Sequence, residues 1–513
     1  MNILSLHFGH DGSVSILEGD EIVVHHQLDR FCGIKHQTFL TIKLFDKIKS
    51  LKIKFDKVII TSMGQTNINP VPYLLKKYLD INSSQIVKIF QNEHHIFHAE
   101  CARHFFEYPD KALYFISDGD GAAKRLNNKK NKQIDGTEAI ENESLYDENL
   151  NPIYKYYKAD RPIKIVTEKY LISENISLGK AYQNLVSELG LDYNEEGKAM
   201  ALSSYGKFNK DIAEQLKDNW SFKLNPNKDH TAKDSESLDF VKTFQIVFQQ
   251  LFLNKIKKAN RDYDKLVLSG GCTQNVLNNS FLKQQLNKNI LADPYNGDFG
   301  ISLGSALHHT KIKVKPLKHI CSGFNPELHL GQFQSKNVTS QEIAEILVNE
   351  PVAIFSGKSE QGQRGLGFRS LLGNPLDKSI LDKINTIKKR EWYRPFACTV
   401  LEERAFEFFD MRPNEASPYM MFTYKCKDKR LKNVCSVDNL SRIQTLNRNF
   451  HPKYYDLIKS FERFTELPIV LNTSLNLPGR VLCEDINDLY FMMKNSSLKY
   501  CYLSDKDKLL WLT

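Results

Sequence analysis

The chain has 513 residues, of which 41% are hydrophobic and 26% charged, the balance of a globular protein that buries a large core without disulfide staples. Its net charge of +9 is mild for this length and suits anionic small substrates; no nucleic-acid-binding motif is recognisable, so nucleic acid is not expected as the main substrate. Nine scattered cysteines without a C-x-x-C pair, a first segment unlike a signal peptide and no run of ~20 apolar residues predict a cytoplasmic protein without a membrane span.

Short β-prone segments begin the chain. Residues 3–8, 13–17 and 21–26 are predicted strands, and His10-Asp11-Gly12 is a turn after the first of them. Actin-like nucleotide-handling domains begin with such a strand, tight polar turn and returning strand, although any β-meander begins in the same way. The start of the chain therefore permits an actin-like domain without requiring one.

Two histidines and two aspartates form the first candidate site. His94 and His98 lie four residues apart in a predicted helix, residues 93–106, and therefore share one face of it. Asp118 follows a predicted strand and Asp298 lies between glycines, places where α/β folds often carry a metal-binding or catalytic carboxylate. A histidine pair alone is more often ordinary helix surface, but the carboxylates favour a metal site. Such a ligand set suits Fe²⁺, Mn²⁺ or Zn²⁺, and ligand type does not separate these ions.

The middle of the chain alternates predicted strands and helices, which is typical of an α/β fold. Residues 113–117 and 265–268 are predicted buried strands, and residues 236–259 a long helix. Residues 123–163 are polar and rich in Lys, Asn and Glu, and predict a long loop or surface excursion. No internal repeat is visible.

Two motifs in this half could contact a ligand. The glycines of Ser269-Gly270-Gly271-Cys272 follow a strand and would let backbone amides approach a phosphate closely, although a plain tight turn explains the segment equally well. Glu196-Gly197-Lys198 combines a carboxylate, a glycine and an ammonium group. A helix start with a solvated lysine is the alternative interpretation of this second motif.

The C-terminal part is rich in cations. Proline and glycine punctuate residues 311–340, where we place a boundary between domains of residues 1–325 and 345–513. Residues 357–370 combine glycines with two arginines, and residues 388–396 add cations interrupted by aromatic residues and proline, unlike a solvated helix face. Forked guanidiniums, glycines and hydroxyls favour a site for phosphates and carbonyl oxygens. The residues predicted to line it are Arg364, Lys388, Arg390, Arg442 and Ser474.

Each of these motifs is weak alone, but their order along the chain is specific. The ordered set is His10-Asp11, Arg30-Phe31 with Lys35-His36, His94 with His98, Asp118-Gly119, Glu196-Gly197-Lys198, Gly270-Gly271 with Asn275, Gly297-Asp298, Glu360 to Ser370, Lys388 to Phe396, Asp438 to Gln444 and Asn472-Thr473-Ser474. This set resembles the NodU/CmcH-type O-carbamoyltransferases, and the resemblance covers essentially the whole chain.

The resemblance implies two domains and two reactions. The first domain would be actin-like, which means a duplicated ribonuclease-H-like α/β fold, and the second a mixed α+β domain similar to threonylcarbamoyl-AMP synthase. The second domain would convert carbamoyl phosphate and ATP, with Mg²⁺, into carbamoyl-AMP. The first, with a His/His/Asp/Asp metal site that commonly holds iron, would transfer the carbamoyl group to a hydroxyl of a small molecule such as a sugar, a nucleoside or a natural product.

The resemblance also implies roles for residues and reveals departures. Catalytic roles follow for His10 and Lys35 beside the five residues of the cationic part. The residues implied to bind nucleotide or carbamoyl-AMP are Gly119, Glu196, Lys198, Gly270, Gly271, Asn275, Arg369, Arg394, Asn472 and Thr473. The departures, all in the C-terminal part, are Gln363, Gly365, Cys398, Ser436 and Asn439, where the family usually has Pro, Ala, Pro, His and Gly.

Two other functions remain open. An actin-like kinase or ATPase would need no second site and would leave the C-terminal arginines without a role. A non-catalytic nucleotide-binding regulatory protein conflicts with the retention of all four candidate metal ligands. The sequence does not decide the acceptor, the native metal or whether the chain forms a homodimer.

Overall fold

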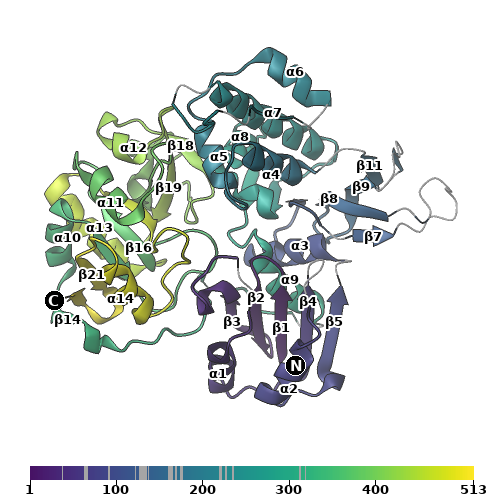
Figure 1. Ribbon diagram of the computed structural model, residues 1–513, viewed down its shortest axis with the longest axis horizontal. Coiled ribbons are helices and arrows are strands. Elements are labelled where there is room, and N and C mark those ends of the chain that lie inside the picture. Colours follow the sequence, from purple (N-terminus) through teal and green to yellow (C-terminus); the bar gives the residue numbers. More distant parts are fainter. Residues whose placement is uncertain are drawn as a thin grey trace. The chain divides into compact units, whose positions relative to one another are not determined.

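The computed structural model describes residues 1–36, 39–62, 67–90, 93–121, 123–125, 136, 138–159, 166–167, 170–173, 177–218, 222–225, 228–233, 236–310, 313–317 and 319–512. The chain forms two compact units (Figure 1). Met1–Val23 and Lys52–Leu317 make the N-terminal unit, and Val24–Leu51 and Lys318–Thr513 make the C-terminal unit. This division differs from the predicted domains because a segment near the start of the chain belongs to the C-terminal unit.

Two mixed sheets with the same strand order build the N-terminal unit. The first has the order β3-β2-β1-β4-β5, with β1 antiparallel to β2 and parallel to β4. In the second, β6 takes the place of β1 in the run β9-β8-β6-β12-β13, antiparallel to β8 and parallel to β12. An order of third, second, first, fourth and fifth strand is the ribonuclease-H-like topology. Its duplication confirms the predicted actin-like α/β fold.

The strands of these sheets agree with most of the segments predicted from sequence. The first sheet contains β1 (Ile3–Phe8), β2 (Ser13–Glu18), β3 (Glu21–Gln27), β4 (Lys57–Ser62) and β5 (Ile86–Phe90). The second contains β6 (Ala112–Ser117), β7 (Ala123–Arg125), β8 (Glu138–Tyr146), β9 (Pro152–Ala159), β10 (Val166–Thr167), β11 (Tyr170–Ser173), β12 (Lys265–Ser269) and β13 (Asn289–Ala292). The central strands β1 and β6 are buried at every position, as expected where both faces of a sheet are covered.

The prediction of a loop over residues 123–163 was wrong for the part of that segment that the structure describes. β8 and β9 form an antiparallel hairpin with two irregularities in its register, and β7 pairs with β8. Asp147 Oδ1 accepts the backbone N–H of Asn149 and of Asn151, which closes the turn between the strands. The tyrosines of β9 supplied the β-propensity, but the surrounding Lys, Asn and Glu obscured it. Residues 122, 126–135, 137 and 160–163 lie outside the described residues.

The helices of the N-terminal unit connect the strands and cover the sheets (Figure 1). They are α2 (Val71–Leu79), α3 (His94–Phe105), α4 (Leu178–Glu188), α5 (Glu196–Leu202), α6 (Lys210–Asp218), α7 (Ser237–Lys257), α8 (Val276–Gln285) and α9 (Ile301–His308). α3 and α9 follow the last strand of their respective sheets and pack against each other. Gly304 allows this contact, because a Cβ atom there would lie 1.9 Å from the carbonyl oxygen of Phe97.

We expect Gly304→Ala to destabilise the protein by about 1–3 kcal/mol, the usual cost of an overpacked contact, because neither helix backbone can retreat. The measurement is urea unfolding followed by circular dichroism. Gly197→Ala is the matched control, since Gly197 also lies in a helix but a Cβ there meets no atom within 4 Å. Equal unfolding midpoints for both variants and the parent would contradict the close contact.

The C-terminal unit is built on one mixed sheet with the order β14-β22-β21-β15-β16-β20-β17-β19-β18. Its strands are β14 (Gln334–Asn337), β15 (Val352–Phe355), β16 (Arg369–Gly373), β17 (Ala397–Leu401), β18 (Thr423–Lys425), β19 (Leu440–Leu446), β20 (Ile469–Ser474), β21 (Tyr500–Leu503) and β22 (Lys508–Trp511). Its helices are α1 (Ile42–Ser50), α10 (Ser340–Asn349), α11 (Ile380–Lys388), α12 (Ala405–Phe408), α13 (Pro452–Thr465) and α14 (Ile486–Lys494). α10 and α13 pack on each other over a fully apolar core.

Hydrogen bonds build the segment Val24–Leu51 into the C-terminal unit. The N–H of Gln27 donates to Gln361 Oε1 at 3.0 Å, and Gln27 Oε1 accepts the N–H of Gly362 at 2.9 Å. Arg30 Nη2 donates to both Gln27 Oε1 and the Gly362 carbonyl. Because all of these groups are buried, removing the segment would leave polar groups without partners, so it is a structural part of this unit.

Candidate metal centre and anion site

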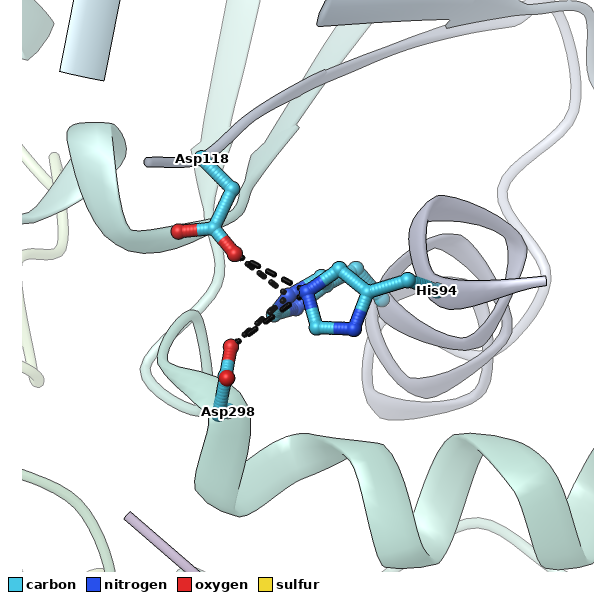
Figure 2. Close-up of side chains that lie close together, drawn as sticks. His94, Asp118 and Asp298 are labelled. Carbon is cyan, nitrogen blue, oxygen red and sulfur yellow. Dashed lines mark hydrogen bonds and ion pairs between the residues drawn. The ribbon is translucent and has the colours of Figure 1, made fainter. Parts of the chain in front are cut away.

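The four predicted metal ligands lie together in the N-terminal unit. Figure 2 shows the imidazole of His94 facing the carboxylates of Asp118 and Asp298. His94 Nε2 lies 2.9 Å from Asp118 Oδ2 and 3.4 Å from Asp298 Oδ1. His98 Nε2 lies 3.5 Å from each of the same two oxygens. One ligand atom from each of the four buried residues lies within 4.8 Å of the other three, which is the spacing of a single ion site.

The duplicated fold explains why these residues meet. His94 and His98 lie in the first turns of α3, and Asp298 begins a short 3₁₀ turn that leads into α9, the equivalent helix of the second half. Asp118 directly follows β6, the first strand of the second sheet. Ligands at the ends of strands and the beginnings of helices are typical of sites in α/β folds.

The glycines Gly270 and Gly271 orient one of the carboxylates. Gly270 has a φ of +89°, and a Cβ there would lie 2.3 Å from the carbonyl oxygen of Ser117, so the turn after β12 needs glycine to pass this close to β6. The N–H of Gly271 donates to Asp118 Oδ1 at 3.2 Å. Since Oδ1 is held in this way, Oδ2 is directed to the two imidazoles.

The residues fit a divalent metal ion. His98 Nε2 and both oxygens of Asp298 are buried, and none of them has a hydrogen bond of normal length. Polar atoms left in this state are rare in proteins and indicate a missing partner such as an ion. Burial lowers the pKa of His94, yet the charge of Asp298 and the hydrogen bond of Asp118 raise it to about 10 overall. The pocket therefore attracts positive charge, which two nitrogen and two oxygen donors can hold as Fe²⁺, Mn²⁺ or Zn²⁺.

Two further histidines face the same carboxylate. His10, predicted to be catalytic, has its Nε2 3.7 Å from Asp298 Oδ2, and its side chain is 38% exposed. His7 was missed by the sequence analysis; its Nε2 lies 3.9 Å from Asp298 Oδ2 and its Nδ1 3.0 Å from Thr61 Oγ1. A buried histidine in an otherwise apolar strand, β1, was the signal that could have revealed it.

A cluster of guanidiniums lies in the C-terminal unit. It consists of Arg364, Arg390, Arg394 and Arg442, which come from three separate segments of the chain. Burial lowers the pKa of Arg442 well below its usual value, and the charges of Arg364 and Arg390 lower it further. Arg442 Nε is buried without a hydrogen-bonding partner. Among the described residues, the charges that act most strongly on Arg442 are all positive, so an anion bound among these guanidiniums would be stabilised.

Lys388 and Ser474, both predicted to be catalytic, lie beside each other. Lys388 Nζ donates to the carbonyl oxygen of Ser474 at 2.7 Å and to the carbonyl and side-chain oxygens of Asn476, both at 2.6 Å. Burial lowers the pKa of Lys388, and the charges of Arg390 and Lys35 lower it further. Lys388 therefore holds the end of β20 in place beside the guanidiniums.

Both halves of the chain match models of one family. Residues 61–307 match the carbamoyltransferase N-terminus and residues 343–507 the carbamoyltransferase C-terminus. The chain belongs to the carbamoyltransferase family. As an enzyme it is a carbamoyltransferase. The four candidate metal ligands lie in the first matched region and the guanidinium cluster in the second.

Relatives of this carbamoyltransferase include named and unnamed proteins. An uncharacterised protein of Methanocaldococcus jannaschii is 27% identical over 96% of each chain. Nodulation protein NolO of Bradyrhizobium diazoefficiens is 28% identical over 63% of this chain and 67% of its own. Nodulation protein U of Sinorhizobium fredii is 34% identical over 42% of this chain and 40% of its own.

Among solved structures, the activator of the 2-hydroxyisocaproyl-CoA dehydratase from Clostridium difficile with bound ADPNP is 12% identical, with a TM-score of 0.32, over 60% of this chain and 94% of its own. The strand order of its two sheets identifies the fold of the N-terminal unit as actin-like. No helix in the described ranges is long and apolar enough to cross a membrane.

Arg369 of the carbamoyltransferase differs from the other predicted arginines. Its side chain is fully buried, and its two Nη atoms are saturated by the protein itself. They donate hydrogen bonds of 2.8 to 3.0 Å to the carbonyl oxygens of Ser356, Phe368, Gly357 and Glu484. Arg369 therefore ties the start of β16 to neighbouring loops, and its geometry does not favour the predicted contact with nucleotide.

We expect Arg369→Met to lower the free energy of unfolding by about 2–4 kcal/mol, because several buried carbonyl groups lose a charged donor. Thermal and urea unfolding measure this loss. Arg430→Met, at an exposed arginine that pairs with Asp428, should change stability by less than about 0.5 kcal/mol. A fully stable Arg369→Met protein with lost nucleotide affinity would instead restore the predicted binding role.

Other predicted binding residues also use their side chains within the protein. Asn275 caps the start of α8 by accepting the N–H of Asn278. Asn472 Nδ2 donates to Thr399 Oγ1 at 2.8 Å, and Lys198 forms an ion pair with Glu195. These three side chains therefore have partners within the protein itself.

The remaining predicted residues lie at turns or strand ends. The carbonyl of Gly119 accepts a hydrogen bond from the Ser177 hydroxyl, and Glu196 is the first residue of α5. Thr473, in β20, accepts a hydrogen bond from Arg390 Nη2 at 3.3 Å. Thr473 therefore joins β20 directly to the guanidinium cluster.

Two departures from the family pattern have a structural reason. Asn439 has a φ of +60°, a conformation that asparagine and glycine adopt more readily than other residues, so it can stand where the family has glycine. A Cβ at Gly365 would lie 2.9 Å from Ser474 Cα, so this loop packs more closely on β20 than an alanine would allow. Cys398 is fully buried in β17, beside Ser441.

Proposed function

We propose that this carbamoyltransferase is an ATP-dependent O-carbamoyltransferase. Its C-terminal unit would make carbamoyl-AMP from carbamoyl phosphate and ATP, the latter with Mg²⁺. Its N-terminal unit would then transfer the carbamoyl group to a hydroxyl of a small molecule, such as a sugar, a nucleoside or a natural product. The observation that carries this proposal is the partly buried guanidinium cluster, because an actin-like kinase or ATPase would give it no ligand.

The first reaction needs a site rich in positive charge. Carbamoyl phosphate and water give carbamate and phosphate, and a carbamate oxygen then attacks the α-phosphorus of ATP. The bond to the β-phosphate breaks, and carbamoyl-AMP and pyrophosphate result. Charge builds on phosphate oxygens during this attack, and the guanidiniums of Arg364, Arg390 and Arg442 would stabilise it.

The second reaction needs a polarised carbonyl group and a proton acceptor. The acceptor oxygen attacks the carbamoyl carbon, the bond from that carbon to the AMP oxygen breaks, and AMP leaves. His10 is partly exposed beside Asp298, and we propose that it takes the proton of the acceptor hydroxyl. We propose that His94, His98, Asp118 and Asp298 hold Fe²⁺, or alternatively Mn²⁺ or Zn²⁺. A metal there would act as a Lewis acid toward carbonyl or phosphate oxygen.

Product analysis tests the proposal on the full-length protein. With ATP, Mg²⁺ and carbamoyl phosphate, we expect one phosphate and one pyrophosphate for each carbamoyl-AMP formed, and no pyrophosphate when carbamoyl phosphate is omitted. Release of ADP without pyrophosphate would support an actin-like kinase or ATPase instead. No nucleotide turnover with any hydroxylated acceptor would support a regulatory protein.

A further inference from the structure

The turn that follows β12 touches the surroundings of both metal-site carboxylates. On one side, the N–H of Gly271 holds Asp118 Oδ1. On the other side, Thr273 Oγ1 accepts a hydrogen bond of 3.0 Å from Asn296 Nδ2. Asn296 lies two residues before Asp298, which begins its own turn. Asp118 and Asp298 come from distant parts of the chain, and this turn is hydrogen-bonded both to Asp118 and to the segment before Asp298.

The hydroxyl of Thr273 is at the centre of this connection. Thr273 is fully buried, and its Oγ1 donates to the carbonyl oxygen of Gly270 at 2.8 Å while accepting from Asn296. The backbone of Thr273 is fixed as well, because its carbonyl accepts from Asn279 Nδ2 at 2.7 Å. The backbone N–H and the hydroxyl of Thr273 thus both donate to the Gly270 carbonyl in the glycine turn that orients Asp118, and the same hydroxyl anchors the segment that presents Asp298.

We propose that Thr273 is a positioning residue of the metal centre, whose hydroxyl sets the separation of the two carboxylates. This inference rests on the proposed metal site. Thr273 touches none of the four ligands itself, and it acts through Gly271 and Asn296. Outer-shell partners of this kind orient metal ligands, and their loss typically costs 10- to 100-fold in metal affinity.

A parallel anchor supports the same segment. Ser269, also in the turn region, donates its hydroxyl hydrogen to Asp293 Oδ2 at 2.7 Å, and Asp293 Oδ1 accepts the N–H of Tyr295. The segment that presents Asp298 is therefore held at two points, Asp293 and Asn296. Because the hydrogen bond between Ser269 and Asp293 remains when Thr273 is changed, we expect the protein to fold while the metal site binds its ion more weakly.

The test compares Thr273→Val, which keeps the shape and removes the hydroxyl, with Thr273→Ser, which keeps the hydroxyl. Zn²⁺ affinity of the full-length protein is measured by competition with a chromophoric chelator, and folding by circular dichroism. We expect about 10- to 100-fold weaker binding for Thr273→Val and nearly parental binding for Thr273→Ser. Pyrophosphate release should be unchanged in both, because it is assigned to the other unit.

Asn296→Ala breaks the same link from its other end and serves as the second variant. Since Asn296→Ala removes a hydrogen bond that Thr273→Val also removes, the double variant should bind Zn²⁺ about as weakly as Thr273→Val alone, whereas unrelated sites would give additive losses. Parental affinity in Thr273→Val, with metal lost from His98→Ala, would overturn the positioning role and leave the metal centre standing. Parental Zn²⁺ affinity in both Thr273→Val and His98→Ala would overturn the positioning role and the metal centre together.

Discussion

Replacing Arg442 by methionine is expected to lower carbamoyl-phosphate-dependent pyrophosphate release by about 10²- to 10³-fold, the usual loss when one preorganised donor is removed from an active site. The physical reason is that Arg442 is held among other guanidiniums with its Nε buried and unpartnered. An anion bound among these guanidiniums would give this group a partner. Methionine fills the space of the side-chain stem, so the loss should come from charge and not from packing.

Three measurements distinguish this effect from a folding defect. Arg430→Met, at an exposed arginine of the same unit, should release pyrophosphate within about twofold of the parent. The metal content of Arg442→Met should equal that of the parent, and the variant should still transfer carbamoyl from supplied carbamoyl-AMP. Pyrophosphate release within a few-fold of the parent would show that Arg442 is structural.

His98→Ala is expected to have the opposite phenotype. Removing one of two nitrogen donors should weaken metal binding by more than the 10- to 100-fold caused by losing an outer-shell partner, and elemental analysis of the purified protein measures this. Transfer to an acceptor should fall by about 10²- to 10³-fold, because polarisation of the carbamoyl group is lost. Formation of carbamoyl-AMP should continue at the parental rate.

A matched histidine tests whether the effect is specific. His329→Ala, at an exposed position, should leave both metal content and transfer unchanged. If His98→Ala remains folded but loses carbamoyl-AMP formation and carbamoyl transfer equally, the assignment of the two reactions to separate units is wrong. A single shared site would then have to be considered.

The candidate metal site could be predicted because its signals are local. Four-residue spacing on a helix puts His94 and His98 on one face wherever that helix lies. Asp118 and Asp298 each lie at the end of an element, where glycine leaves space around a carboxylate. What the sequence could not provide was their convergence, which depends on the equivalent positions of α3 and α9 in a duplicated fold. The duplication is one of strand order, and it leaves no repeat in the sequence.

The arginines show where sequence reasoning reaches its limit. Arg369 and Arg442 belong to the same family pattern and have the same chemistry, yet the two Nη atoms of Arg369 donate to four carbonyl groups, whereas Arg442 lies among other guanidiniums. Which of them can meet an anion depends on loops that are far away in the chain. The hairpin of β8 and β9 was missed for a similar reason, because pairing across strands outweighed the polar composition.

The placement of Val24–Leu51 has a consequence for how the chain folds during synthesis. Lys43 forms an ion pair with Asp485, which lies 442 residues further along the chain. At ribosomal rates of about 5–20 residues per second, roughly 20–90 s pass between the synthesis of these partners. The sheets of the N-terminal unit can close as soon as Leu317 has emerged, while α1 gains its ion pair with Asp485 only when the start of α14 has been made. The nascent chain thus completes the contacts of this early segment only when translation is nearly finished.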